Sequence, residues 1–181
     1  MTASAATPSP HDVAAARALL AEHMAQVVHE EWVQHVEHDP ELDRWYLRFG
    51  CDGRDAATIY FDLHQRSLHH ELYFLPAPDD AARRAELHAW VLGRNHQLSR
   101  THFSLGPDGD VYLVGRTHLA HLDHDELDHV IGAIYEATEQ WFQAAVRIAY
   151  GRGGPRRPEP APAAGVGGPG PVPPDPGRST P

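Results

Sequence analysis

Histidine is the residue type with the greatest potential for chemistry in this sequence, because the 181 residues include 15 of them. The densest group lies in one segment and consists of His118, His121, His124, His129, Asp123 and Asp125. Imidazole and carboxylate groups are common ligands of zinc and other transition metals, so this segment is a candidate metal site. A structural zinc site takes four ligands from converging elements, whereas these residues lie on a loop that runs into the start of a helix. We therefore favour a solvated histidine-rich surface, with metal binding or pH sensing as the alternatives.

Motifs for nucleophilic catalysis and for phosphate binding are absent from the sequence. The only cysteine, Cys51, lies in a Cys-Asp-Gly turn without a nearby histidine, so the chain has neither an internal disulfide nor a cysteine-only zinc site. No G-x-S-x-G motif surrounds Ser67, Ser99 or Ser104. The glycine-rich runs after Tyr150 have no strand before them and no helix after them. We predict a protein that is not an enzyme, with no catalytic residue, no cofactor and no metal ligand assigned.

Charge and hydropathy exclude two further classes of function. The 15 basic residues are all arginine and face 25 acidic residues, which gives a formal net charge of -10. Nucleic-acid binding needs clustered positive charge, so DNA and RNA are not the expected partners. The apolar runs are a few residues long, far below the roughly 20 needed to cross a bilayer. Residues 1–10 contain neither a basic residue nor an apolar stretch, so we expect no secretory signal and a cytoplasmic location.

Composition divides the chain into three parts. Residues 151–181 contain 10 prolines and 8 glycines, which is typical of a disordered tail. Residues 1–10 are polar and alanine-rich and are predicted to be a disordered leader. The folded domain is then expected at residues 11–150, where 11 basic residues face 23 acidic ones.

Three segments of this domain repeat apolar residues at helical spacings of three and four. The predicted helices cover residues 12–38, about 79–98 and 123–150. Pro40 ends the first helix, because the residue before a proline avoids helical geometry. Asp79 is the expected N-cap of the second helix, and Asp123 with Glu126 forms a variant of the capping box at the start of the third. Gly151 is a typical helix end.

Alternation of apolar and polar residues predicts five strands between these helices. They are expected at residues 45–49, 59–63, 67–75, 102–105 and 111–116. The Gly-Pro-Asp-Gly turn at residues 106–109 has the composition of a hairpin connection. The order α-β-β-β-α-β-β-α predicts a two-layer α+β domain, with a five-stranded, mainly antiparallel sheet and helices packed on one face.

The face of the sheet turned away from the helices is the candidate binding surface. In the first three strands it carries Tyr46, Arg48, Tyr60, Asp62, His69, Glu71 and Tyr73. Tyrosine tolerates partial hydration and is favoured at interfaces. We therefore predict a protein-binding surface that consists of Tyr46, Arg48, Tyr60, Glu71 and Tyr73.

The last helix is the second surface of interest, because it is long and carries an aromatic stripe. Tyr135, Trp141 and Phe142 are expected to pack against the sheet. The alternative is that part of the stripe meets a second copy of the chain across a two-fold axis, and a homodimer is the expected assembly.

The element order and six short segments together resemble a known family. The segments are residues 45–49, 58–61, 72–78, 94–95, 111–115 and 125–128, which read WYLRF, TIYF, LYFLPAP, RN, VYLVG and DELD. This pattern resembles the YbjN family, whose bacterial members are described as sensory transduction regulators, and the resemblance covers residues 19–150. It implies a fold similar to type III secretion chaperones and a non-enzymatic cytoplasmic protein that binds other proteins, often as a homodimer. The arginine-only basic set and the Pro/Gly-rich tail suit an actinobacterial member.

From these observations we predict a chaperone-like or regulatory protein-binding module of the YbjN type. Its acidic surface favours a basic or amphipathic protein client. A histidine-based metal or small-ligand sensor is the alternative function.

Overall fold

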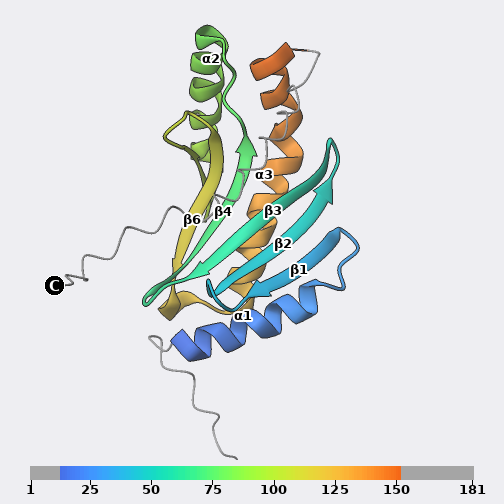
Figure 1. The fold of residues 1–181 in the computed structure, drawn as a ribbon, viewed down its shortest axis with the longest axis vertical. Helices are drawn as coiled ribbons and strands as arrows, with labels where there is room; N and C mark the ends of the chain where they lie inside the picture. Colours follow the sequence, from blue (N-terminus) through green and yellow to red (C-terminus); the bar gives the residue numbers. More distant parts are fainter. Residues whose placement is uncertain (1–12, 152–181) are drawn as a thin grey trace, which may run out of the picture.

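The computed structural model describes residues 13–151 (Figure 1). The predicted leader, residues 1–10, and the predicted tail beyond Gly151 lie outside the described residues. The elements follow in the order α1 (Val13–Val27), β1 (Val33–Asp39), β2 (Arg44–Cys51), β3 (Arg54–Leu63), β4 (Ser67–Leu75), α2 (Ala81–Leu92), β5 (His102–Leu105), β6 (Val111–His118) and α3 (His124–Tyr150). Short 3-10 turns lie at Asn95–Gln97 and Leu119–His121.

The strands form one six-stranded sheet with the order β1-β2-β3-β4-β6-β5, in which every neighbouring pair is antiparallel. Figure 1 shows the sheet in front, with α3 running behind it and α1 below β1. The fold is therefore a two-layer α+β arrangement, which confirms the predicted class. The predicted number of five strands is wrong by one.

The additional strand is β1, which the periodicity had assigned to a first helix over residues 12–38. That helix ends at Val27. Val33 and Val36 both point toward the core, although they are three residues apart instead of two. The spacing arises because the pairing with β2 shifts register between Val33 and His35, which is a β-bulge. A bulged edge strand thus reproduces the three-residue spacing of a helix, and this is the physical reason for the error.

The remaining elements follow the sequence pattern closely. The five predicted strands correspond to β2 through β6. Helix α2 begins one residue later than expected, because Asp80 is its N-cap and accepts a hydrogen bond from the Arg83 amide at 2.8 Å. Leu98, predicted to lie in this helix, follows its end at Leu92. Helix α3 begins after Asp123, whose carboxylate accepts a hydrogen bond from the amide of Glu126 at 2.7 Å.

The core lies between the sheet and α3, and aromatic rings form much of it. Phe142 meets the ring of Phe74 at a centroid distance of 5.6 Å, and Trp141 meets Phe103 at 5.8 Å. Tyr135 lies 5.5 Å from Phe49. The aromatic stripe of α3 therefore packs against the sheet of its own chain, as the sequence predicted. Fully buried aliphatic residues fill the rest: Leu20, Leu47, Ile59, Leu72, Leu87, Leu113, Leu127 and Ile134.

The buried imidazole of His70 interrupts this apolar face of the sheet. It is 2% exposed and pairs across β4 and β6 with Gly115. A Cβ atom at Gly115 would collide with the His70 imidazole and with the backbone carbonyl of Arg100. Gly115 therefore provides the space that the buried imidazole occupies.

Two glycine-to-alanine substitutions should change stability in opposite directions. Gly115→Ala places a methyl group in the His70 ring and should lower the free energy of unfolding by about 2 kcal/mol. Gly132→Ala, in the middle of α3, meets nothing within 4 Å and should raise it by about 0.5–1 kcal/mol. Urea denaturation of the two variants measures both effects, and a destabilised Gly132→Ala variant would contradict this packing.

Candidate protein-binding face of the sheet

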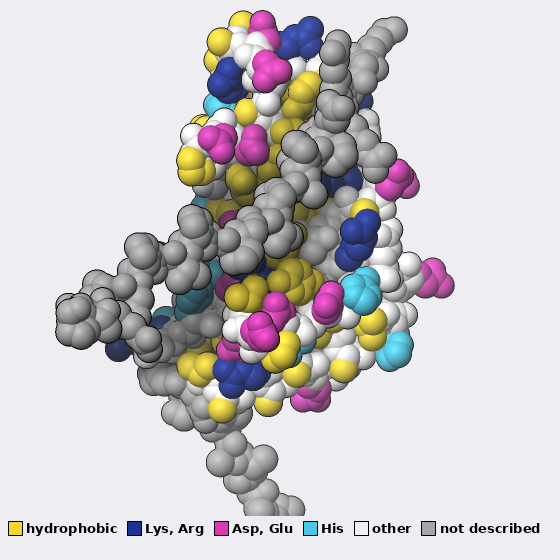
Figure 2. Space-filling view, viewed as in Figure 1, with side chains coloured by type: hydrophobic (Ala, Val, Ile, Leu, Met, Phe, Trp, Pro, Cys, Tyr) yellow, Lys and Arg dark blue, Asp and Glu magenta, His cyan; other side chains and the backbone are white. Residues whose placement is uncertain are grey.

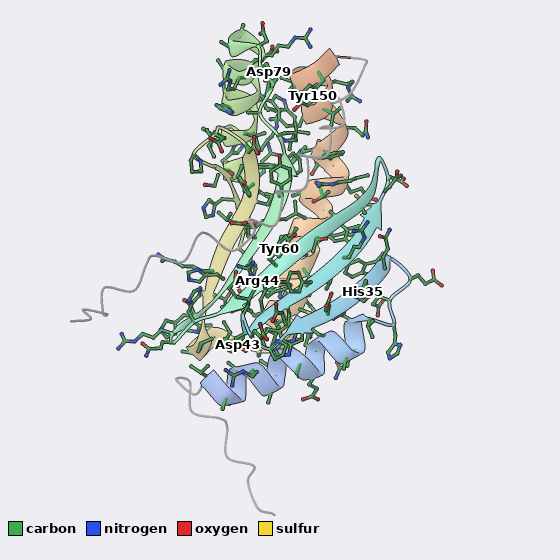
Figure 3. The ribbon with its side chains drawn as sticks, in the orientation of Figure 1. His35, Asp43, Arg44, Tyr60, Asp79 and Tyr150 are labelled. Carbon is green, nitrogen blue, oxygen red and sulfur yellow. The ribbon has the colours of Figure 1, made fainter. Side chains whose placement is uncertain are left out.

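The face of the sheet that points away from the helices carries the predicted site residues. Tyr46 lies between the buried Trp45 and Leu47 on β2, and Tyr60 lies between buried residues on β3 in the same way. In Figure 3 the side chains of Arg44 and Tyr60 lie in front of these strands, on the side away from α3. We call this surface the open face. It consists of Arg44, Tyr46, Arg48, Tyr60, Asp62, His69, Glu71, Tyr73, Tyr112, Val114 and Arg116.

The centre of the open face is a tyrosine pair fixed by an ion pair. Tyr46 and Tyr60 are cross-strand partners, and their rings meet edge to face at a centroid distance of 5.3 Å. The Arg44 guanidinium lies 5.6 Å from the Tyr60 ring and makes two hydrogen bonds to Asp62, at 2.6 and 3.0 Å. Glu71 is the partner of Tyr60 on β4, so three of the predicted residues lie in one row across the sheet.

A second tyrosine pair lies toward the β5–β6 end of the sheet. Tyr73 and Tyr112 are cross-strand partners with ring centroids 5.3 Å apart. The Tyr73 hydroxyl donates a hydrogen bond to Asp110 Oδ2 at 2.9 Å, and Asp110 Oδ1 accepts one from the Ala77 amide at 2.7 Å. Burial and the Asp110 carboxylate raise the pKa of Tyr73, so its hydroxyl remains a donor. Asp110 thus joins the hairpin to the segment after β4.

The remaining predicted residue, Arg48, lies on β2, two residues after Tyr46. It is exposed, faces Thr58 on β3, and donates to the Gln34 side chain at 3.3 Å.

Tyr112 and Asp110 were not among the predicted residues. The alternation of residues 111–116 could have identified Tyr112, because Val111 and Leu113 on either side of it are buried. Asp110 precedes the strand, and only its contacts reveal its role.

The open face is hollowed along β4 and β6. One hollow of about 390 Å³ is lined by Asp62, His69, His102 and Arg116 among others, and a second of about 260 Å³ lies against the β5–β6 turn. The two hollows share Glu71 and Val114 in their lining, so they adjoin. Figure 2, drawn from the same side, shows apolar side chains mixed with acidic and arginine side chains where this face is visible.

Behind the larger hollow lies the buried imidazole of His70. Burial lowers its pKa from the ordinary 6.5 to about 4, and the interaction with the Arg100 carbonyl offsets only part of this shift. Neither ring nitrogen makes a hydrogen bond of ordinary geometry with residues 13–151. The ring is therefore neutral at physiological pH and unfavourable to protonate in the folded state.

The histidine-rich segment does not form a converging ligand set. His118 ends β6 and accepts a hydrogen bond from the Ala120 amide at 3.1 Å, with its ring 6.2 Å from that of His121. His124, in the first turn of α3, contacts His23 on α1 instead, at 3.1 Å between the two Nδ1 atoms. Within the described range, no group of three or more His, Cys, Asp or Glu residues is placed to hold a metal ion.

Comparison with known proteins identifies the family to which the chain belongs. The sequence profile of the YbjN family, described as "Putative bacterial sensory transduction regulator", matches residues 19–146. The chain therefore belongs to the YbjN family. None of the helices in residues 13–151 is long and apolar enough to cross a membrane.

Similar proteins occur in mycobacteria. An uncharacterized protein of Mycobacterium leprae (strain TN) is 28% identical over 129 residues, which is 71% of this chain and 69% of the relative. An uncharacterized protein of Mycobacterium tuberculosis (strain ATCC 25618 / H37Rv) is 30% identical over 86 residues, which is 48% of this chain and 46% of the relative. These relatives agree with the expected actinobacterial type.

The buried imidazole predicts a loss of stability in acid. The unfolded chain takes up the His70 proton as the pH falls through 6.5, whereas the folded chain does so only near pH 4, so protons favour unfolding between these values. At pH 4 this difference in proton uptake should lower the free energy of unfolding by about 3 kcal/mol. Urea denaturation at several pH values measures it. His70→Leu should flatten this part of the profile, while His35→Leu, at an exposed position on β1, should keep it. An unchanged profile in His70→Leu would show that another group is responsible.

Asp110 should contribute to stability through its two hydrogen bonds. Asp110→Ala removes the acceptor of both the Tyr73 hydroxyl and the Ala77 amide, and should lower the free energy of unfolding by about 1–3 kcal/mol. Asp108→Ala changes an exposed carboxylate of the same turn and should have little effect. Thermal and urea denaturation of both variants check this, and equal losses would contradict the assigned role of Asp110.

Proposed function

We propose that this protein is a non-enzymatic binding module that holds a segment of a partner protein on the open face. The observation that carries the proposal is the pair of tyrosine clusters, Tyr46 with Tyr60 and Tyr73 with Tyr112, which the described helices leave uncovered. Tyrosine gives a large contact area at a small entropic cost, and its hydroxyl keeps a partly hydrated surface favourable before the partner binds. The adjoining hollows provide places for partner side chains.

The charge of the chain supports a basic or amphipathic partner. The net charge is -10, and Glu71 is an exposed carboxylate between the two tyrosine pairs. Long-range attraction toward such a surface accelerates association with positively charged segments. Repulsion slows the association of acidic segments. The family description as a sensory transduction regulator supports a regulatory role for the interaction. The cytoplasm is the proposed location.

A second copy of the chain is also a proposed partner. The aromatic stripe of α3 packs against the sheet of its own chain, so this stripe is not the surface we propose for a dimer. The open face carries arginines as well as carboxylates, so it is the surface that we propose for a two-fold contact in spite of the net charge of the chain. Light scattering of the full chain at increasing concentration tests this, and a monomer at all concentrations would refute the homodimer.

Charge reversal on the open face should abolish partner binding. Glu71→Arg changes the sign of the carboxylate between the tyrosine pairs, whereas Glu136→Arg makes the same change at an exposed position of α3. After cross-linking in the organism that encodes the chain, partners recovered with wild type and with Glu136→Arg should be missing with Glu71→Arg. Circular dichroism confirms that both variants are folded. Equal recovery by the two variants would refute the open face as the binding site.

A further inference from the structure

The proline-rich sequence that follows α3 is a feature that the proposed function does not use. Residues 155–162 read PRRPEPAP, and we call them the proline–arginine segment. Pro155 and Pro158 form a P-x-x-P pattern, with Arg156 and Arg157 between them. Segments of this type bind to surfaces lined by aromatic rings, and they lose little conformational entropy on binding because proline fixes φ. The segment therefore has the composition of a ligand for an aromatic surface.

The structure places the start of this sequence close to the second tyrosine pair of the open face. The Tyr150 hydroxyl, at the end of α3, donates a hydrogen bond to the Pro76 carbonyl at 2.6 Å. The amide of the next residue, Ala77, donates to Asp110, which also accepts from the Tyr73 hydroxyl. A continuous series of contacts thus connects the end of α3 to the second tyrosine pair.

The connection between α3 and the segment is short but sufficient. Residues 151–154, which read GRGG, separate the helix from Pro155. The chain leaves the helix direction at Gly151, whose φ is 70°. An extended chain advances at most about 3.5 Å per residue, so Pro158 can lie up to about 25 Å from Tyr150. That length covers the series of contacts to the tyrosine pair.

Carboxylates give this end of the open face a negative charge. Partial burial raises the pKa of Tyr112, and three carboxylates act in the same direction, those of Asp110, Glu71 and Asp108. Asp110 already accepts two hydrogen bonds, whereas the side chains of Glu71 and Asp108 are exposed. None of the described residues that line the adjoining hollow of about 260 Å³ is an arginine. A positively charged segment is therefore attracted to this end of the face.

The tyrosine rings and the hollow beside them match the two side-chain types of the segment. Tyr73 is 38% exposed, and its ring meets that of Tyr112 edge to face. The Tyr112 ring packs over Gly106, where a Cβ atom would lie 2.8 Å from it, so the ring borders the hollow at the β5–β6 turn. Aromatic surfaces of this kind accept proline rings, and guanidinium groups stack on tyrosine.

We propose that the proline–arginine segment of the same chain binds the Tyr73–Tyr112 end of the open face and competes there with the partner protein. This inference rests on the proposed function of the open face and adds a regulation of that site. The short connection gives the segment an effective concentration of order 1 mM, so weak contacts are enough to occupy the site. A basic partner must displace the segment, and its apparent affinity is lowered accordingly.

NMR spectroscopy of the full chain tests the contact directly. Nuclear Overhauser effects should connect the proline ring protons of residues 155–162 with the aromatic protons of Tyr73 and Tyr112. Arg157→Glu should remove these effects and shift the Tyr112 ring signals, because the carboxylates of the open face repel the new carboxylate. Arg178→Glu makes the same change of charge farther along the sequence and should leave the contact intact.

Proline variants test the second feature of the segment. Pro155→Ala combined with Pro158→Ala should weaken the contact, because the proline rings and the restriction of φ are lost. Pro173→Ala combined with Pro176→Ala removes two prolines at the same spacing, in a sequence that has Asp175 and no arginine between them. This second pair should leave the Tyr73 and Tyr112 signals of wild type unchanged. Circular dichroism confirms that all variants are folded.

A synthetic peptide with the sequence of residues 151–163 measures the competition. Its Kd should be about tenfold lower for the Arg157→Glu full chain than for wild type, the ratio expected when a segment at about 1 mM effective concentration binds with a Kd of about 0.1 mM. Arg178→Glu should behave like wild type. Cross-linking in the organism that encodes the chain should recover more partner with Arg157→Glu than with Arg178→Glu.

Three outcomes would overturn the proposal. Equal peptide affinity of wild type and Arg157→Glu would show that the segment does not occupy the face. Loss of partners with Glu71→Arg would still support the proposed function in that case. Tyr112 signals that change with protein concentration would assign the contact to the segment of a second copy. Nuclear Overhauser effects to Tyr46 and Tyr60 alone would place the segment on the first tyrosine pair.

Discussion

The packing of α3 against one face of the sheet is the constraint on which the other features of this structure depend. Phe49, Phe74 and Phe103 meet the aromatic residues of α3 in edge-to-face or tilted contacts, which combine large apolar burial with favourable ring geometry. Side chains of a strand alternate between its two faces, so burial of one set directs the other set outward. The open face, with its tyrosine pairs, is therefore a direct consequence of where α3 packs.

The same packing explains the polar groups that the core contains. Within residues 13–151, the hydrogen-bond partners of the half-buried Arg54 include no carboxylate. It donates instead to the carbonyls of Ala56, Tyr73 and Phe74, and its guanidinium lies 4.5 Å from the Phe142 ring. Burial lowers its pKa to about 10, so it still carries its charge at neutral pH. Arg54 thereby connects the aromatic core to the backbone of β4 beneath the second tyrosine pair.

The chemistry of the open face follows from its position on the side of the sheet that the described helices leave uncovered. The open face is broad, with tyrosine rings and hollows that suit an extended or amphipathic segment. The net charge of -10 is in keeping with a positively charged partner for this face.

The sequence by itself determined the elements in which apolar residues recur at a regular period. Alternation in residues 45–75 was enough to place Tyr46, Tyr60 and Tyr73 on one face, because the period of a strand depends only on local geometry. Only the tertiary structure decided the rest. The bulge that makes β1 a strand depends on its pairing with β2. The contact between His23 and His124 joins residues 101 positions apart. Contacts between distant elements depend on how whole surfaces pack. The local repeat of apolar residues along the sequence contains no information about that packing.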